Sequence, residues 1–263
     1  MFRRGRSIPM DRRVRDRRRS VDRQRGRRRA TLVIAFIGVL VVAALFLWLR
    51  SSDVFAVKRV TATAVEHVTP GEISRATADV RGASLLRLST SAIEERLAEL
   101  PYVRSVEVHR RFPNTLDIRL VEHEPAARLK AENGDLWLVA GDGRALEKSA
   151  ATGLPVVVPD VHVSPQAGTK VPNNIIAALP VAALLRSKGS ATSLPPVDRI
   201  VVSPTGQVTV VLKDGTELRL GDPIQLKQKL TVAATIIEQY LRDGRQLEYV
   251  DASVPDRVAV NAK

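Results

Sequence analysis

Residues 101–127 read PYVRSVEVHRRFPNTLDIRLVEHEPAA, and this stretch decides the fold of the first part of the chain. Apolar and polar side chains alternate in residues 106–109 and again in residues 116–120. A period of two is typical of strands that bury one face. The intervening residues 112–114, Phe-Pro-Asn, favour a turn, so the stretch predicts a β-hairpin.

Two helices and a strand are predicted upstream of this hairpin. The motifs TPGE at 69–72 and SAIE at 91–94 each place a hydroxyl residue three positions before a glutamate, which is the capping-box pattern of a helix start. Residues 54–65 are rich in β-branched side chains and predict a strand. The order strand, helix, helix, strand, strand over residues 53–124 indicates an α+β unit with two helices on one face of a three-stranded sheet.

The N-terminal tail carries most of the charge of the chain. The 263 residues hold 41 Lys+Arg and 28 Asp+Glu, for a net charge of +13, whereas residues 1–29 alone hold 14 Arg and 3 Asp, or +11. The remaining residues are therefore nearly neutral, at +2. A block of Arg could bind nucleic acid by neutralising phosphates. The apolar segment that follows instead favours a basic cytoplasmic tail over residues 1–30, and no nucleic acid is expected as a partner.

Residues 32–49, LVIAFIGVLVVAALFLWL, are 18 consecutive residues without a charge. As a helix this run is about 27 Å long at ~1.5 Å per residue, which is enough to cross a bilayer. The basic residues before it and Trp48 near its end favour a single-pass type II membrane helix over residues 31–50, with a cytoplasmic N-terminus. A cleaved signal peptide is the alternative. Its apolar region would be only about 7–15 residues long and would end at small residues, so an uncleaved anchor is favoured.

Residues 125–263 predict a second, mixed β-rich domain outside the membrane. Asp-Gly at 214–215 separates two apolar runs and is a strong hairpin signal. The motif DPIQ at 222–225 predicts a helix start, and apolar residues then recur at helical spacing over residues 226–240. Residues 247–260 alternate again and predict a final strand at a sheet edge. The domain therefore combines strands with a long C-terminal helix and an edge strand.

Catalytic and metal-binding signatures are absent from the sequence. The chain has no Cys, and none of Gly-x-Ser-x-Gly, Ser-x-x-Lys, Gly-Lys-Ser/Thr or His-Glu-x-x-His occurs. Glu122 and Glu124 flank His123, but strand alternation places both glutamates on the face opposite His123. No enzyme activity, cofactor, metal site or small-molecule substrate is therefore predicted. The histidines fall in unrelated segments, and each is predicted to be exposed: His67, His109, His123 and His162.

The stretch 100–127 is similar to the end of the POTRA domain of the FtsQ/DivIB family of bacterial cell-division proteins. Leu-Pro-aromatic-Val, Val-x-Val, aromatic-Pro, Leu-x-Ile and Val-Glu-x-x-Pro-x-Ala follow one another there. The basic tail, the single anchor and Tyr-Val-Asp at 249–251 also match the family. The resemblance implies a divisome scaffold in the cell membrane at the septum, which links and regulates septal cell-wall synthesis by protein–protein binding. It also implies that FtsB-like and FtsL-like bitopic proteins, together with other divisome proteins, are partners and that the C-terminal strand recruits them.

The resemblance places the partner contacts on five residues near the C-terminus: Tyr249, Ser253, Val254, Asp256 and Val258. Pro255 and Arg257, within this segment, differ from the residues of better-known members. From the residues alone, Arg110, Arg111 and Phe112 at the hairpin tip form a possible recognition surface. A protruding Phe flanked by Arg suits a protein partner or a lipid headgroup, with a solvated tip as the alternative.

A POTRA unit also suggests a second function, a membrane-anchored module that assists the transport or folding of exported proteins by adding strands to its sheet. One such unit in place of several, and the single membrane helix, favour the scaffold. An anchored wall enzyme is disfavoured by the missing motifs. The basic tail could contact anionic lipid, because electrostatic attraction alone is adequate for that.

Overall fold

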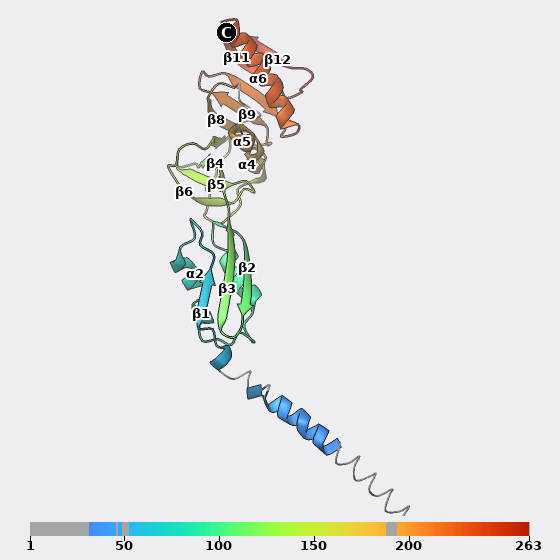
Figure 1. Cartoon of the computed structure of the whole chain (residues 1–263). Helices are drawn as coiled ribbons and strands as arrows, with labels where there is room; N and C mark the ends of the chain where they lie inside the picture. The colour runs from blue at the N-terminus through green and yellow to red at the C-terminus, as the bar shows by residue number, and fades with distance from the viewer. Residues whose placement is uncertain (1–31, 46, 49–52, 188–193, 263) are drawn as a thin grey trace, which may run out of the picture. The chain divides into compact units, whose positions relative to one another are not determined.

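The structure is a computed structural model. It describes residues 32–45, 47–48, 53–187 and 194–262. The described residues divide into two compact units. One comprises residues 32–45, 47–48, 53–59, 79–88 and 110–116, and the other comprises residues 60–78, 89–109, 117–187 and 194–262. The strands form a three-stranded sheet and a nine-stranded sheet (Figure 1). The mixed α+β architecture predicted from the sequence is therefore confirmed.

The N-terminal segment is described only in part. Residues 32–45 form a helix with exposed side chains. The predicted tail over residues 1–30 lies outside the described residues, and so do residues 31, 46, 49 and 50 of the predicted span. Among the helices that the structure describes, none has the length and apolar character needed to span a membrane. The membrane helix over residues 31–50 therefore stays a prediction.

The predicted strand over residues 54–65 is longer than the strand that forms. β1 covers only Arg59–Ala62, and Asp53–Phe55 form a short 3-10 helix, η1. The cause is a long-range backbone bond, because the Val57 N–H donates to the carbonyl oxygen of Ala83 (2.9 Å). This bond draws the start of the predicted strand toward another loop and away from the sheet.

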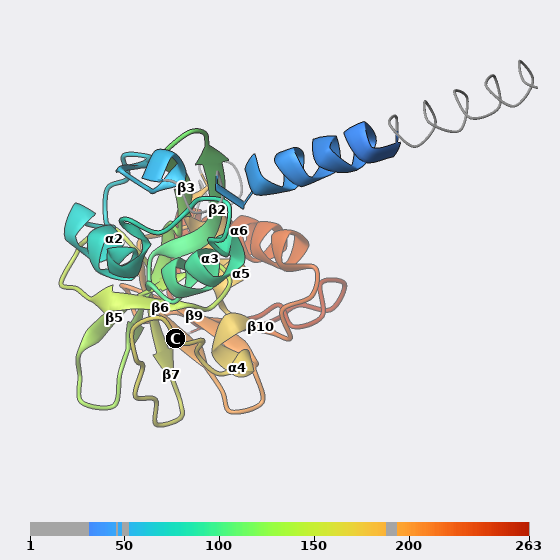
Figure 2. The ribbon, with the colours of Figure 1, turned by 90° about the horizontal axis from the view of Figure 1, so that it is seen from below.

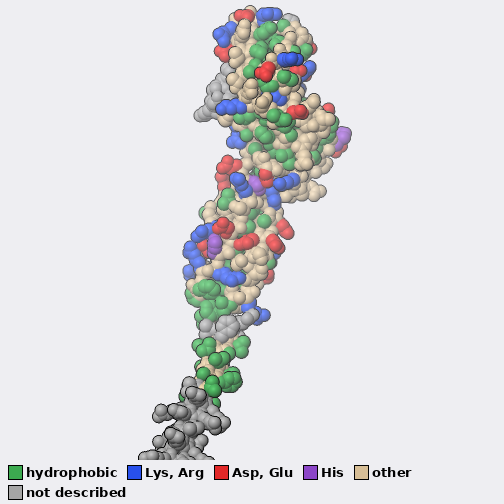
Figure 3. All heavy atoms as spheres, turned by 90° about the vertical axis from the view of Figure 1, so that its right-hand side faces the viewer, with side chains coloured by type: hydrophobic (Ala, Val, Ile, Leu, Met, Phe, Trp, Pro, Cys, Tyr) green, Lys and Arg blue, Asp and Glu red, His purple; other side chains and the backbone are tan. Residues whose placement is uncertain are grey.

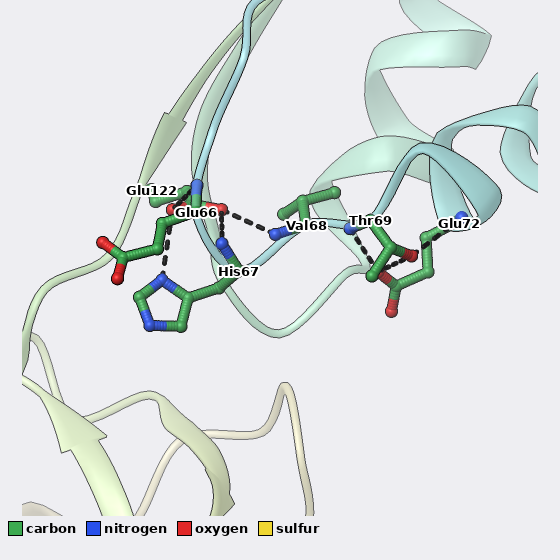
Figure 4. Close-up of polar contacts among 6 residues, drawn as sticks. All are labelled: Glu66, His67, Val68, Thr69, Glu72 and Glu122. Carbon is green, nitrogen blue, oxygen red and sulfur yellow. Dashed lines mark hydrogen bonds and ion pairs between the residues drawn. The ribbon is translucent and has the colours of Figure 1, made fainter.

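The first predicted capping box is confirmed. α2 covers Pro70–Ala76 and is followed by a second 3-10 helix, η2, at Ala78–Val80. The Thr69 hydroxyl accepts the Glu72 N–H (3.3 Å), and the Glu72 carboxylate accepts the Thr69 N–H (2.8 Å) (Figure 4). Two backbone donors at the helix start are thereby satisfied from within the motif.

The second predicted capping box, at residues 91–94, is wrong. α3 covers Thr90–Ala98, and its N-cap is Ser89, whose hydroxyl accepts a backbone N–H of the first turn (3.4 Å). The Glu94 carboxylate instead accepts the N–H of Val108 (2.8 Å), farther along the chain. A tertiary contact therefore takes the side chain that the local motif would have used. α2 and α3 lie against each other (Figure 2).

The predicted hairpin is confirmed. β2, Val103–Arg111, and β3, Thr115–Glu122, flank a turn at residues 112–114. The strand order β1-β3-β2 places β3 at the centre of the three-stranded sheet. The side chains that the hairpin buries alternate with polar ones along the chain, as predicted. They are Val108 of β2 and Leu116, Ile118 and Leu120 of β3.

The nine-stranded sheet comprises β4 Pro125–Lys130, β5 Leu136–Ala140, β6 Ala145–Lys148, β7 Val156–Pro159, β8 Val197–Val202, β9 Val208–Leu212, β10 Glu217–Gly221, β11 Leu247–Asp251 and β12 Ala259–Ala262. Their order across the sheet is β12-β11-β10-β9-β8-β7-β4-β5-β6. Strand β7 is not predicted from the sequence. It is short, lies in a Pro-rich segment, and forms through parallel pairing with the distant strands β4 and β8.

In the described part of this region, the sheet is accompanied by the helices α4 Asn173–Ile176, α5 Leu179–Arg186 and α6 Leu226–Arg242. The core lies between the sheet and these helices, and α6 packs on β10 and β11. The predicted apolar stripe of α6 is confirmed. It consists of the buried Leu226, Leu230, Ala233 and Ile237 and the partly buried Tyr240.

The predicted start of α6 at residues 222–225 is wrong. The helix begins only after Gln225, whose backbone is left-handed with a φ of 55°. The buried ammonium group of Lys229 donates to the carbonyl oxygens of Leu220 (2.7 Å) and Asp222 (2.8 Å). These bonds occupy carbonyl groups ahead of the helix and hold this segment in a turn, so the motif does not become the first helical turn.

Candidate functional site

The nine-stranded sheet ends in β6 on one side and β12 on the other. The outer side of β6 is covered by backbone hydrogen bonds. The Ala145 N–H donates to the carbonyl oxygen of Thr169, and the Gly168 N–H donates to the carbonyl oxygen of Ala145 (both 2.8 Å). Across the described residues, no backbone group pairs with the outer side of β12. An unpaired strand edge can accept a strand from another chain, so β12 is the candidate binding edge.

The hydrogen bonds of the neighbouring strands show which groups of β12 point outward. β10 and β11 are parallel, with Arg219 opposite Asp251, and the Arg219 oxygen accepts the Ala252 N–H (2.9 Å). The backbone N–H and C=O groups of successive residues in a strand point in opposite directions. The backbone groups of Asp251 therefore point toward β12, and those of its partner Ala259 point back toward β11. The N–H and C=O groups of Val260 therefore point away from the sheet.

The five predicted contact residues do not lie on one edge strand. The single strand predicted over residues 247–260 is wrong, since β11 and β12 are an antiparallel pair joined by residues 252–258. Tyr249 lies on β11 and is flanked by Glu217 of β10 and Asn261 of β12. Its backbone is therefore inside the sheet, and only its side chain is available to a partner.

The other four predicted residues lie on the connection between β11 and β12. Ser253, Val254 and Asp256 are exposed, whereas Val258 is half-buried and packs against the hydrophobic core. The chain turns here because the Asp251 carboxylate accepts the Ser253 N–H (2.9 Å), a local bond that competes with strand extension. A substitution at Val258 would consequently change packing as well as any binding.

The side chain of Tyr249 belongs to a charged group that the sequence analysis did not identify. The Arg219 guanidinium carbon lies 4.2 Å from the centre of the Tyr249 ring, and Arg219 also pairs with Glu217 (2.9 Å). The hydrogen bond to Glu217 raises the pKa of Arg219, so its charge is retained. Glu217 and Arg219 are far from Tyr249 in sequence. Their i, i+2 spacing on a predicted strand is the signal that could have placed them on one face.

Gly221 supports the connection that follows β11. Its φ is +63°, and an added Cβ would lie 2.9 Å from the Ser253 Cβ. We expect Gly221→Ala to displace residues 252–258 and to lower the free energy of unfolding by about 1–3 kcal/mol, because it adds a clash to a left-handed backbone. Gly244→Ala is the matched control, since Gly244 has a φ of +70° but open space around an added Cβ. Chemical denaturation compares the two variants, and equal losses would show that the Ser253 contact contributes nothing.

The Asp251 carboxylate makes the same connection sensitive to acid. Burial would raise its pKa, but the hydrogen bonds from the Ser253 hydroxyl and N–H outweigh this and lower the pKa below its ordinary value of 3.8. A carboxylate whose pKa is lower in the folded state than in the unfolded state stabilises the fold at pH values above its unfolded-state pKa. This contribution is lost as the pH falls through the folded-state pKa. We expect the protection of residues 252–258 against hydrogen exchange to be constant above about pH 5 and to decrease below it. Asp251→Asn should remove this dependence, and an unchanged pH profile in that variant would contradict the assignment.

Glu122, for which the sequence suggests no role, holds a loop in place. Its carboxylate accepts the backbone N–H groups of Glu66 (3.1 Å), His67 (2.8 Å) and Val68 (2.7 Å) (Figure 4). Burial would raise the pKa of Glu122, but the hydrogen bonds from His67 and Val68 lead the contributions that lower it overall. The role of this carboxylate is therefore structural, and it closes the loop ahead of α2.

The predicted exposure of His123 is wrong. The residue is only 9% exposed, and its ring Nδ1 lies 3.7 Å from Asp142 Oδ1. Burial lowers the pKa of His123, and the nearby Asp142 offsets this only in part. Strand alternation does not foresee this burial, because it depends on the turn after β5. Within the described ranges, no group of three or more His, Asp or Glu side chains is placed to hold a metal ion.

The three predicted tip residues lie together at the turn of the hairpin. The Arg110 guanidinium donates to the carbonyl oxygen of Leu88 (2.7 Å), and Arg111 is the exposed last residue of β2. Phe112 is 57% exposed, yet its ring meets Phe55 edge to face at 5.9 Å between ring centres. The structure therefore adds Phe55 and Leu88 to the predicted group.

Two family descriptions match this chain. "POTRA domain, FtsQ-type" matches residues 55–123, and "Cell division protein FtsQ/DivIB, C-terminal" matches residues 127–253. The chain is similar to cell division protein FtsQ of Anaeromyxobacter sp. (strain K), with 29% identity covering 92% of this chain and 87% of that protein. It is also similar to FtsQ of Corynebacterium glutamicum, with 26% identity covering 82% and 90%. FtsQ of Streptomyces venezuelae is 35% identical over 49% of each chain.

Proposed function

Because the chain belongs to the FtsQ/DivIB family of bacterial cell-division proteins, we propose that it is a divisome scaffold that links and regulates septal cell-wall synthesis by binding other proteins. The observation that carries the proposal is the open edge of the nine-stranded sheet at β12. The proposed activity is binding, without a catalytic step.

The proposed partners are FtsB-like and FtsL-like bitopic division proteins. An extended segment of such a partner would add to β12, with backbone hydrogen bonds to Val260 providing affinity. Its side chains would meet Tyr249 and the exposed Ser253, Val254 and Asp256, which provide specificity. Support comes from the outward direction of the Val260 groups and from the closed opposite edge at β6.

Membrane anchoring is part of the same proposal. Residues 31–50 would cross the membrane once, with the basic tail in the cytoplasm and the protein located at the division septum. The proposed domains are a POTRA domain over 53–124 and a β domain over 125–263. Their support is the match of family descriptions to residues 55–123 and 127–253. Anchoring restricts the search for partners to two dimensions, which raises their effective concentration.

Depletion of the protein in its own host tests the scaffold role. Cells that lose it should fail to divide and become filamentous or branched, and a full-length fusion with a fluorescent N-terminus should restore division and collect at midcell. Normal division after depletion, with the fusion spread evenly over the membrane, would reject the scaffold. The module for exported proteins would then be the function to pursue.

A further inference from the structure

Three segments of one compact unit form a surface that we call the Phe112 tip: residues 53–59, 79–88 and 110–116. Backbone hydrogen bonds connect the segments. The Val57 N–H donates to the carbonyl oxygen of Ala83 (2.9 Å), and the Lys58 N–H donates to the backbone carbonyl oxygen of Asn114 (2.9 Å). Together with the bond from Arg110 to the Leu88 oxygen, they make the tip one continuous surface.

The tip exposes large apolar side chains from all three segments. Phe112 is 57% exposed, Val54 53% and Leu86 41%. The edge-to-face contact with Phe55 holds the Phe112 ring in place. A group of exposed apolar side chains on an ordered framework marks a surface that meets another phase or another molecule.

Basic residues accompany these apolar side chains. By sequence the three segments hold six basic residues against Asp53 and Asp79, a net charge of +4, whereas residues 30–263 together carry only +2. The basic residues are Lys58, Arg59, Arg81, Arg87, Arg110 and Arg111. Figure 3 shows hydrophobic and basic side chains next to one another on this part of the surface. Positive charge is therefore concentrated where apolar side chains are exposed.

The length of the chain places this tip close to the proposed anchor. The proposed membrane helix ends at residue 50, and the tip begins at residue 53. Three residues span at most about 10 Å, because an extended chain advances ~3.3–3.6 Å per residue. The tip is therefore tethered within reach of the headgroup layer outside the membrane.

We propose that the Phe112 tip docks on an anionic phospholipid surface, with Phe112, Val54 and Leu86 at the boundary between headgroups and acyl chains. The basic residues around them pair with lipid phosphates. A lipid surface fits better than a protein partner because the tether holds the tip at the bilayer and the charge is complementary to anionic headgroups. The inference rests on the membrane anchor of the proposed function and adds a second attachment to it. That attachment would restrict how far the remaining chain can tilt.

The absence of cysteine allows a direct test with the full-length protein. Leu86→Cys carries a fluorophore at the tip, and Thr152→Cys carries the same fluorophore in an exposed loop. Both are reconstituted into vesicles of phosphatidylcholine and phosphatidylglycerol that contain a lipid-attached quencher. We expect quenching at position 86 to exceed that at position 152 at least about three-fold, and to decrease in vesicles of phosphatidylcholine alone.

A charge reversal tests the basic residues. Lys58→Glu with Arg81→Glu changes the net charge of the tip from +4 to 0 by sequence. This pair should lower the quenching at position 86 at least about two-fold, because attraction to an anionic surface adds up over basic residues. The matched control, Lys213→Glu with Lys227→Glu, changes the total charge equally at exposed positions outside the tip and should have no effect.

Flotation of the vesicles separates this inference from the anchor. A chain that floats with the vesicles but is quenched equally at positions 86 and 152 overturns the docking of the tip and leaves the scaffold in place. A chain that does not float has no anchor, which overturns both the tether and the docking. Shielding of position 86 that occurs only in vesicles containing host membrane proteins would assign the tip to a protein partner and reject the lipid.

Discussion

Replacement of Val260 by proline is expected to weaken capture of the proposed FtsB-like partner at least about tenfold, which corresponds to about 1.4 kcal/mol. Proline removes the outward N–H of residue 260. A carbonyl oxygen of the added partner strand would then be buried without a hydrogen-bond donor, at a cost of about 1–3 kcal/mol. The fold should persist, because that N–H has no partner within the described sheet and proline is tolerated on edge strands. Affinity is measured with the full-length protein purified in detergent.

Val260→Ala is the control for this result. Alanine loses the same partly buried side-chain contacts but retains the backbone N–H, so capture should change by less than about three-fold. Equal losses in the alanine and proline variants would assign the effect to packing and contradict strand addition at β12. Unchanged capture in both variants would place the partner elsewhere on the protein.

Replacement of Glu122 by alanine is expected to lower the free energy of unfolding by about 2–4 kcal/mol, since hydrogen bonds to a charged group are worth about 1.5–3 kcal/mol each and water can replace those at exposed donors. The loss should be local at first. The N–H groups of Glu66, His67 and Val68 lose their common acceptor, so their hydrogen exchange should accelerate more than that of the hairpin. Denaturant titration and hydrogen exchange of the full-length protein measure the two effects.

Two further substitutions separate the carboxylate from the position in the chain. Glu122→Gln retains one acceptor oxygen without the charge, so we expect about half of the loss seen with alanine. Glu124→Ala changes an exposed glutamate two residues away and should alter stability by less than about 0.5 kcal/mol. A comparable loss in the Glu124 variant would show that the three backbone bonds to Glu122 are not the source of the effect.

Short-range signals accounted for much of the fold. The hairpin of β2 and β3 formed where side chains alternate, the apolar stripe of α6 is buried as its helical spacing predicts, and Thr69 caps α2 through its own motif. Each of these patterns is complete within a few residues, and the same residues make the contacts that stabilise the element. Periodicity and capping are therefore readable without knowledge of the neighbours.

The candidate site was predicted only in outline. The resemblance placed the partner contacts near the C-terminus, and the residues alone suggested a recognition surface at the hairpin tip; both stay predictions. The sequence did not reveal that residues 252–258 leave the sheet. The alternating pattern continues through this segment, whereas the hydrogen bond from the Ser253 N–H to the Asp251 carboxylate turns the chain out of the strand. It also did not associate Arg219 with Tyr249, because strands far apart in sequence bring them together.

The sequence by itself determined the elements with strong local periodicity, the basic tail, the apolar segment and the resemblance to FtsQ/DivIB proteins. Only the tertiary structure decided that Glu94 bonds to β2 in place of its own helix start, that Lys229 delays the start of α6, and that β12 is the open edge. The physical reason is the range of the interactions. A helix cap or an alternating strand is encoded in neighbouring residues, whereas the order of strands in a sheet depends on backbone pairing between distant segments, which leaves no pattern in either segment alone.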